Sequence, residues 1–123
     1  MLSMGFSSPD DVFRVHPKIR WAALVSEEGQ VRFCQMRSGV VSHCPEEEDF
    51  RFAEFNPILL IGAGERMARW DGQVESVTVA YEKVLMYVHK CKDGILTLTV
   101  DKENDGADAI REISKTLKAM TND

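Results

Sequence analysis

The sequence predicts an α+β domain in which helices flank a five-stranded antiparallel sheet. Five short segments have the apolar or alternating pattern of strands, and three others carry helix signals, in the order α-β-β-α-β-β-β-α. The connections between the first and second, the third and fourth, and the fourth and fifth strands are too short for a crossover, which predicts antiparallel hairpins. At 123 residues the chain fits one domain. We expect that domain over residues 8–121 and expect residues 1–7 to be disordered.

The first predicted element is a short helix. Ser8 and Pro9 supply an N-cap and a helix-opening proline, and Asp11 follows at the position from which an acid reaches back to the cap. The helix should end near His16, because Pro17 restricts the residue before it to extended conformations.

Two strands follow, at residues 20–26 and 31–37. The first is a short apolar run, which is typical of a buried strand. Residues 27–30, Glu-Glu-Gly-Gln, have the composition of a hairpin turn between them.

A long middle helix is predicted over residues 45–70. Pro45 opens it without the loss of a hydrogen bond, and the acidic residues 46–49 face the positive end of its dipole. Pro57 should kink or break the helix, or Asn56 could cap a fresh helix there. The segment should end at Gly72.

Three strands at residues 74–81, 84–89 and 95–100 complete the sheet. Asp93-Gly94 is a strong hairpin signal between the last two. A final helix opens at residues 104–106 and presents one apolar stripe to the sheet. The residues of that stripe are Ile110, Ile113, Leu117 and Met120.

Composition excludes several functional classes. A net charge of −5 opposes binding to nucleic acid and to anionic lipid. The longest apolar run, residues 57–61, is far too short to cross a bilayer, and the N-terminus does not have the pattern of a signal peptide. Three cysteines without CxxC spacing fit reduced thiols. We therefore expect a cytoplasmic protein that binds neither nucleic acid nor membranes.

The segment Gly62-Ala63-Gly64 resembles the start of a dinucleotide-binding turn, because it follows an apolar run. Met67 occupies the third glycine position, where its side chain would block close packing of helix on strand. The few residues before Asp71 leave no room for a crossover. A nucleotide-binding function is therefore only a third alternative.

Other chemical motifs are weak. His43, Cys44, His89 and Cys91 offer nitrogen and sulfur ligands, but their spacing matches no zinc module. The acids at 46–49 could form an acid pair or a cation site, although at a helix start they ordinarily offset the dipole. No nucleophile signature surrounds any serine or cysteine. We predict no catalytic residue, no metal site and no cofactor.

The predicted element order resembles the roadblock/dynein light chain domain, a profilin-like fold. The segments HPKIRWAALV at 16–25 and YEKVLMYV at 81–88 are similar to an archaeal branch of this family. The resemblance covers residues 8 to 120 and implies the strand order 2-1-5-4-3. It also implies no enzymatic activity, dimerisation through the middle helix and third strand, and a scaffolding or regulatory role, often with small GTPases.

A homodimer interface is predicted along the middle helix and the third strand. The apolar run at 58–61 spans more than one helical turn, so its side chains cannot all face the sheet. In the implied order, the third strand lies at an edge with free backbone groups. The predicted interface residues are Ile58, Ile61, Gly62, Glu65, Ala68, Ser76 and Thr78.

A small-ligand sensor is the main alternative, because a profilin-like sheet can also form a pocket. Large apolar side chains on the strands could line it. The candidate pocket residues are Trp21, Phe33, Met36, Met86 and Tyr87.

Overall fold

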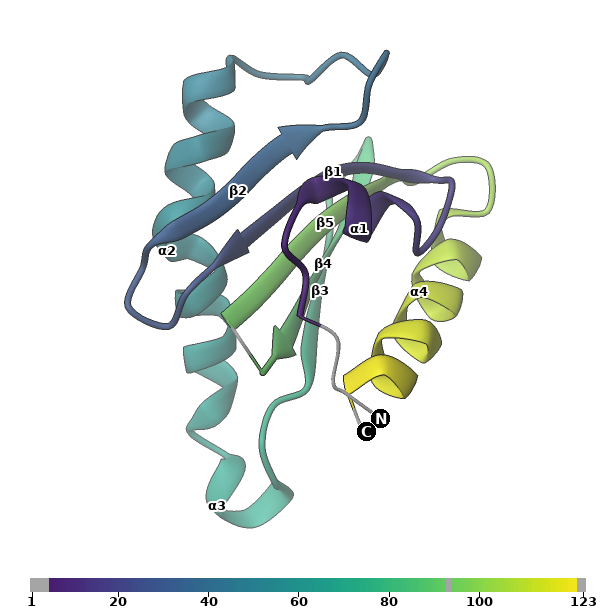
Figure 1. Ribbon diagram of the computed structural model, residues 1–123. Helices are drawn as coiled ribbons and strands as arrows, with labels where there is room; N and C mark the ends of the chain where they lie inside the picture. Colours follow the sequence, from purple (N-terminus) through teal and green to yellow (C-terminus); the bar gives the residue numbers. More distant parts are fainter. Residues whose placement is uncertain (1–4, 93, 122–123) are drawn as a thin grey trace.

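The computed structural model describes residues 5–92 and 94–121. A five-stranded antiparallel sheet has the order β2-β1-β5-β4-β3, which confirms the predicted fold class and strand order. The sheet lies between α2 on one face and α1 with α4 on the other (Figure 1). The strands are β1 (Ile19–Val25), β2 (Val31–Met36), β3 (Ser76–Ala80), β4 (Val84–Cys91) and β5 (Gly94–Asp101), and the helices are α1 (Pro9–Phe13), α2 (Glu46–Glu65), α3 (Ala68–Asp71) and α4 (Gly106–Thr121).

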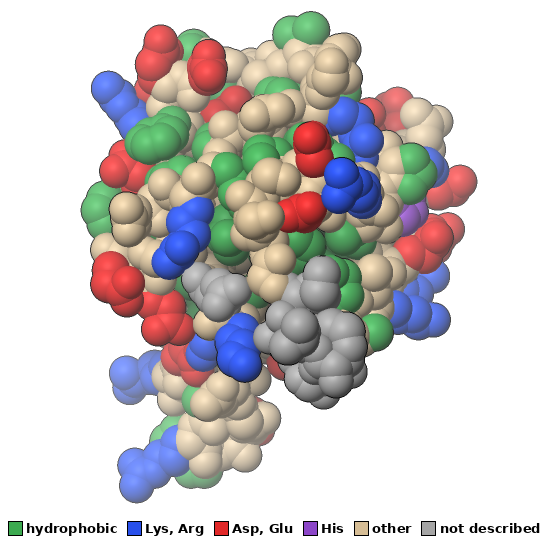
Figure 2. All heavy atoms as spheres, viewed as in Figure 1, with side chains coloured by type: hydrophobic (Ala, Val, Ile, Leu, Met, Phe, Trp, Pro, Cys, Tyr) green, Lys and Arg blue, Asp and Glu red, His purple; other side chains and the backbone are tan. Residues whose placement is uncertain are grey.

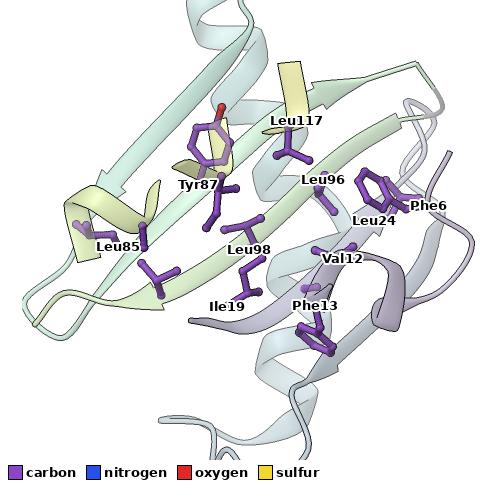
Figure 3. Close-up of a cluster of buried hydrophobic side chains, with 14 residues drawn as sticks. Phe6, Val12, Phe13, Ile19, Leu24, Leu85, Tyr87, Leu96, Leu98 and Leu117 are labelled. Atoms are coloured by element: carbon purple, nitrogen blue, oxygen red, sulfur yellow. The ribbon is translucent and has the colours of Figure 1, made fainter. Parts of the chain in front are cut away.

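The face under α1 and α4 carries the larger core. The predicted stripe of α4 faces the sheet, with Ile113 and Leu117 fully buried. Alternate residues of the strands meet it, among them Leu96 and Leu98 of β5 (Figure 3). This face therefore has the closed packing of an ordinary domain interior.

Helix α2 runs through Pro57 without interruption, so neither a break nor a fresh cap at Asn56 occurs. Pro57 is buried on the sheet side together with Ala53 and Ile61, which are one turn away on either side. The Asn56 side chain instead donates a hydrogen bond to the Phe52 carbonyl at 3.3 Å. Packing of this stripe on the sheet offsets the backbone bond that proline lacks.

The predicted helix over residues 45–70 ends earlier than expected. Helix α2 stops at Glu65, and the short α3 follows it beyond the end of the sheet (Figure 1). Gly64 lies where the returning chain crosses close by, because a Cβ there would be 2.8 Å from Cγ2 of Val74. The glycine thus permits a close approach within the subunit.

Residues just before Ser8 contact the domain. Phe6 is buried in the core beside α1, and Asp11 accepts hydrogen bonds from the Ser7 and Ser8 amides. Residues 1–4 of the predicted disordered segment lie outside the described residues, as does Asp93 of the predicted turn. Gly94 still pairs with Cys91, as the hairpin prediction requires. Its backbone φ is +147°, and any Cβ there would collide with the Val25 carbonyl, so the position requires glycine.

Candidate functional site: an apolar helix face, a free edge and a pocket

Helix α2 has a second apolar face, directed away from the sheet. Phe55 and Leu59 are 59% and 65% exposed, and the neighbouring Gly62 is also exposed. A Cβ at Gly62 would meet no atom within 4 Å. These three residues form a stripe on the side of the helix opposite the buried residues. Large exposed apolar side chains that lie together are typical of an interface.

The predicted interface residues lie in different environments. Ile61 belongs to the subunit's own core, at 4% exposure beside Met86 and Val88. Glu65 accepts a hydrogen bond from Nζ of Lys90 at 2.9 Å, which fixes the end of α2 to β4. The other members range from half-buried to exposed: Ile58, Ala68 and Ser76 are half-buried, and Gly62 and Thr78 are exposed.

Sequence reasoning missed the most exposed apolar residues of this region. These are Phe55 and Leu59 on α2, and Met67 and Trp70 at α3. The apolar run at residues 58–61 covers a whole helical turn, so it does not show which side of the helix faces the sheet. Ala53 and Pro57, which are one turn apart, mark the side of α2 that faces the sheet. A helical projection that starts from these two residues places Leu59 on the outer side.

Strand β3 forms one edge of the sheet and pairs only with β4 among the described strands. Val77 and Val79 pack on the cluster beneath α2, so Ser76 and Thr78 point to the opposite face. The outer backbone groups of an edge strand are free to pair with another strand. Helix α2 packs across all five strands, and Phe55 of its exposed face lies beside Gly29 of the β1–β2 hairpin, where a Cβ would be 3.2 Å from the Phe55 ring.

A cavity of about 620 Å³ lies between the first half of α2 and the strand ends. Its floor is apolar, with Trp21, Met36, Phe52 and Met86. The 42–44 loop and the 81–84 hairpin form parts of its rim. The volume falls within the range of small-molecule sites.

Three of the five predicted pocket residues line this cavity: Trp21, Met36 and Met86. Phe33 and Tyr87 lie on the other face and pack on the core under α4, where Figure 3 shows Tyr87. Tyr87 directly follows Met86, and consecutive residues of a strand point to opposite faces. The two therefore cannot share one pocket.

Polar groups of the cavity rim largely bind one another. Arg20 contacts the Asp101 carboxylate at 3.0 Å and donates to the Val41 carbonyl at 3.1 Å. Asp49 accepts hydrogen bonds from Oγ of Ser42 at 2.8 Å and Sγ of Cys44 at 3.2 Å. These contacts hold the loop before α2 against the helix start.

The thiols in and near the cavity are not activated. The hydrogen bond to the Asp49 carboxylate raises the pKa of Cys44, and burial raises the pKa of Cys34 to about 11. Both thiols are therefore protonated near neutral pH, the opposite of what a nucleophilic cysteine needs. Within residues 5–92 and 94–121, no cluster of three His, Cys, Asp or Glu side chains could hold a metal ion. His89 is on the α4 face, apart from the loop that holds His43 and Cys44.

No helix in the described part of the chain is long and apolar enough to span a membrane. Gly62 and Gly64 lie inside α2 rather than at a turn between a strand and a helix. The geometry of a dinucleotide-binding turn is thus not formed.

The element order, the sheet order and the single long helix on one face define a roadblock-type fold. Solved structures with this fold superpose on nearly the whole chain. A Roadblock/LC7 domain from Streptomyces avermitilis has 18% identity and a TM-score of 0.63, covering 89% of this chain and 88% of that one. The gliding protein MglB from Thermus thermophilus has 15% identity and a TM-score of 0.64, covering 92% and 84%. Myxococcus xanthus MglB has 14% identity and a TM-score of 0.64, covering 98% and 92%.

No protein-family model and no curated protein sequence matches the chain. The likeness is therefore one of fold, and it confirms the resemblance to roadblock domains. A further MglB structure is described as having a tetrameric arrangement, so assembly of copies is a property of that protein.

Proposed function

We propose that this chain is a non-enzymatic, homodimeric interaction module of the roadblock type. It would act in the cytoplasm as a scaffold or regulator of a protein partner, with a small GTPase as the expected class. Two observations carry the proposal: the free edge of β3, and the exposed apolar stripe of α2 that Phe55, Leu59 and Gly62 form. A twofold axis would cover both features in two copies at once.

Charge along α2 favours an antiparallel pair of helices. Glu46 to Asp49 form an acidic first turn, while Arg66 and Arg69 follow the other end. When two copies run antiparallel, each acidic end faces the partner's basic end. Such complementary charges orient an association. The small Gly62 would let a partner side chain approach the helix closely.

The dimer can be tested with a charge placed in the stripe. We expect the wild-type chain to be dimeric by sedimentation equilibrium at tens of micromolar, and Leu59→Glu to be monomeric but folded. Leu59 is 65% exposed, so the charge does not enter the subunit core. Ile61→Glu would be a poor probe, since Ile61 is buried in that core.

Ala107→Glu on α4 is the matched control, because it adds the same charge at an exposed helical position away from α2. It should stay dimeric. A wild-type chain that sediments as a monomer at these concentrations contradicts the proposal, since a standard-sized interface would be populated.

The partner class needs a separate measurement. Small GTPases encoded beside or together with this chain would be loaded with GDP or a GTP analogue and tested by bio-layer interferometry. We expect the affinity to differ between the GDP-bound and the GTP-analogue-bound GTPase, because a regulator that contacts the switch segments of a GTPase binds their two conformations differently. Equal binding or none for both nucleotides would reject a GTPase partner and leave the dimer proposal intact.

Ligand sensing is the second candidate function, and the cavity floored by Trp21, Met36 and Met86 favours it. A ligand that binds only the folded state raises the melting temperature. Thermal-shift measurements with nucleotides and small metabolites would reveal it, with Met86→Ala as the variant that enlarges the floor.

A further inference from the structure

Beyond the end of the sheet, α3 carries an exposed aromatic residue beside cations. Trp70 is 70% exposed, and Met67 next to it is 51% exposed. The guanidinium of Arg69 lies 5.7 Å from the centre of the Trp70 ring, and Arg66 is also exposed. In Figure 2 this end projects from the body and carries blue cationic side chains. Most of the Trp70 surface is thus open to water, which is costly for a large apolar ring.

The cavity lies at the opposite end of α2 from Trp70. Its floor is apolar, and Glu48 and Asp49 of the acidic turn line its α2 side. Arg51 contacts Glu48 at 3.4 Å, so one cation offsets only part of that turn. Lys83, Glu82 and Arg20 also line the cavity, away from α2, and Arg20 contacts Asp101 at 3.0 Å. Attraction for a basic segment would therefore come only from the acidic turn on the α2 side.

Spacing along the chain relates these two features. Leu59, the centre of the exposed stripe, also lies within one residue of the midpoint between residues 46 and 71, the outer ends of α2 and α3. Trp70 and Glu48 are equally distant from Leu59 in sequence, on opposite sides. Helix α2 ends at Glu65, so an antiparallel pairing of two copies about Leu59 brings the end of α2, with the α3 that follows it, toward the other copy's Glu48 at the rim of the cavity.

Pairing of the free edges leads to the same arrangement. If β3 of two copies pair antiparallel, the start of one strand lies beside the end of the other. Residues 72–75 join α3 to the start of β3, and Tyr81, Glu82 and Lys83 follow its end and line the cavity. The partner's α3 is thereby brought to this copy's cavity.

We propose that Trp70 of each copy inserts into the cavity of its partner, with Arg66 and Arg69 facing the partner's acidic turn. The inference rests on the proposed dimer and deepens it, because each cavity is completed by a residue from the other copy. A fully covered tryptophan in a pocket is the kind of residue that dominates interface energy. Truncating it in Trp70→Ala should weaken dimerisation by at least about tenfold.

The native Cys44 at the cavity rim allows a direct test by disulfide trapping. In Trp70→Cys, mild oxidation should yield a covalent dimer on non-reducing electrophoresis. The linked residues need Cα atoms within about 7 Å. Residues 44 and 70 of one chain flank opposite ends of the 20-residue α2, about 30 Å long, so the bond must join two copies.

Two matched variants identify the link. Trp70→Cys combined with Cys44→Ser should give no covalent dimer, because the other native cysteines, Cys34 and Cys91, do not line the cavity and are half-buried. Lys115→Cys, at an exposed position on α4, should give none either. Positions 70 and 115 are both on the surface, so a cysteine at either position should not affect folding.

The outcomes separate this inference from the dimer itself. The placement of Trp70 is overturned, and the proposed function left standing, if the wild type is dimeric by sedimentation but Trp70→Cys forms no link to Cys44. A small molecule retained in the purified dimer and seen by native mass spectrometry overturns the placement too, because the cavity would then belong to a ligand. A monomeric wild type overturns both proposals.

Discussion

The two faces of the sheet are formed by the same strands, but they differ in how completely the helices of the subunit cover them. Under α4, the buried residues Tyr87, Leu98 and Leu117 belong to one large cluster that the subunit closes by itself. Under α2, a cavity of about 620 Å³ remains, and the outer side of the helix exposes Phe55 and Leu59. The first face stabilises the fold. The second carries the surface that we propose for assembly.

The largest expected effect comes from a truncation on the closed face. Leu117→Ala should lower the free energy of unfolding by about 2–5 kcal/mol, because it leaves a cavity under α4. Leu59→Ala should change the stability of the isolated subunit by no more than about 0.5 kcal/mol. Urea denaturation at the lowest workable protein concentration compares them. Equal losses would contradict the distinction between the faces.

A smaller effect is expected from two glycines of α2 that face different surroundings. Gly62→Ala should stabilise the isolated subunit by up to about 1 kcal/mol, since its Cβ enters open space in a helix. Gly64→Ala should lose that gain, because its Cβ would be 2.8 Å from Val74. Denaturation midpoints test the pair, and sedimentation should show a weaker dimer for Gly62→Ala alone.

The closed face also holds a buried histidine, His89. Its Nδ1 lies 3.0 Å from the Tyr87 hydroxyl, which donates to Oγ of Ser114 at 3.1 Å. Burial, followed by the charge of Lys118, lowers the pKa of His89, and Glu75 opposes this. The unfolded chain therefore takes up a proton before the folded chain does.

The stability that neutral His89 contributes is thus fully present above about pH 6.5, the ordinary histidine pKa. It is lost as the pH falls from there through the lower pKa of the folded state. His89→Asn should flatten this part of the stability profile measured by denaturation at a series of pH values. Parallel wild-type and variant profiles between about pH 7 and 5 would show that the histidine plays no such part.

The smallest effect concerns a thiol at the cavity rim. Asp49→Asn should lower the pKa of Cys44, because the carboxylate that bonds the thiol raises that pKa. Alkylation by iodoacetamide near neutral pH should become faster at Cys44. Cys34, whose pKa burial raises to about 11, is the internal reference and should stay slow. An unchanged ratio of the two rates would contradict the role of Asp49.

The sheet was predictable because its signals are local. Short hairpins such as the turn at Gly94 require the two strands that they join to be neighbours in the sheet. The apolar run from Trp21 to Val25 indicates a buried strand. Pairing of β1 with β5 is non-local, and only the family resemblance implied it.

Details of α2 were less predictable, because they depend on packing. Pro57 argues for a break by local rules, yet the helix continues through it, with Pro57 buried on the sheet side. Ile61 and Leu59 are equally apolar, so composition cannot say which one faces outward. Only some of the pocket residues could be predicted from the sequence. Alternation along a strand shows that Met86 and Tyr87 face opposite sides of the sheet, but the closeness of loop 42–44 to Trp21 depends on the folded chain.

The strand order limits how far such a sheet can grow. Joining two copies through β3 would leave β2 at both outer margins of the combined sheet. Strand β2 exposes Arg32, and a second β2 meeting it antiparallel would bring like charges together. Charged edge strands are a common protection against fibre formation. The same chain thus has one edge suited to pairing and one that terminates the assembly, which favours a finite particle over a polymer.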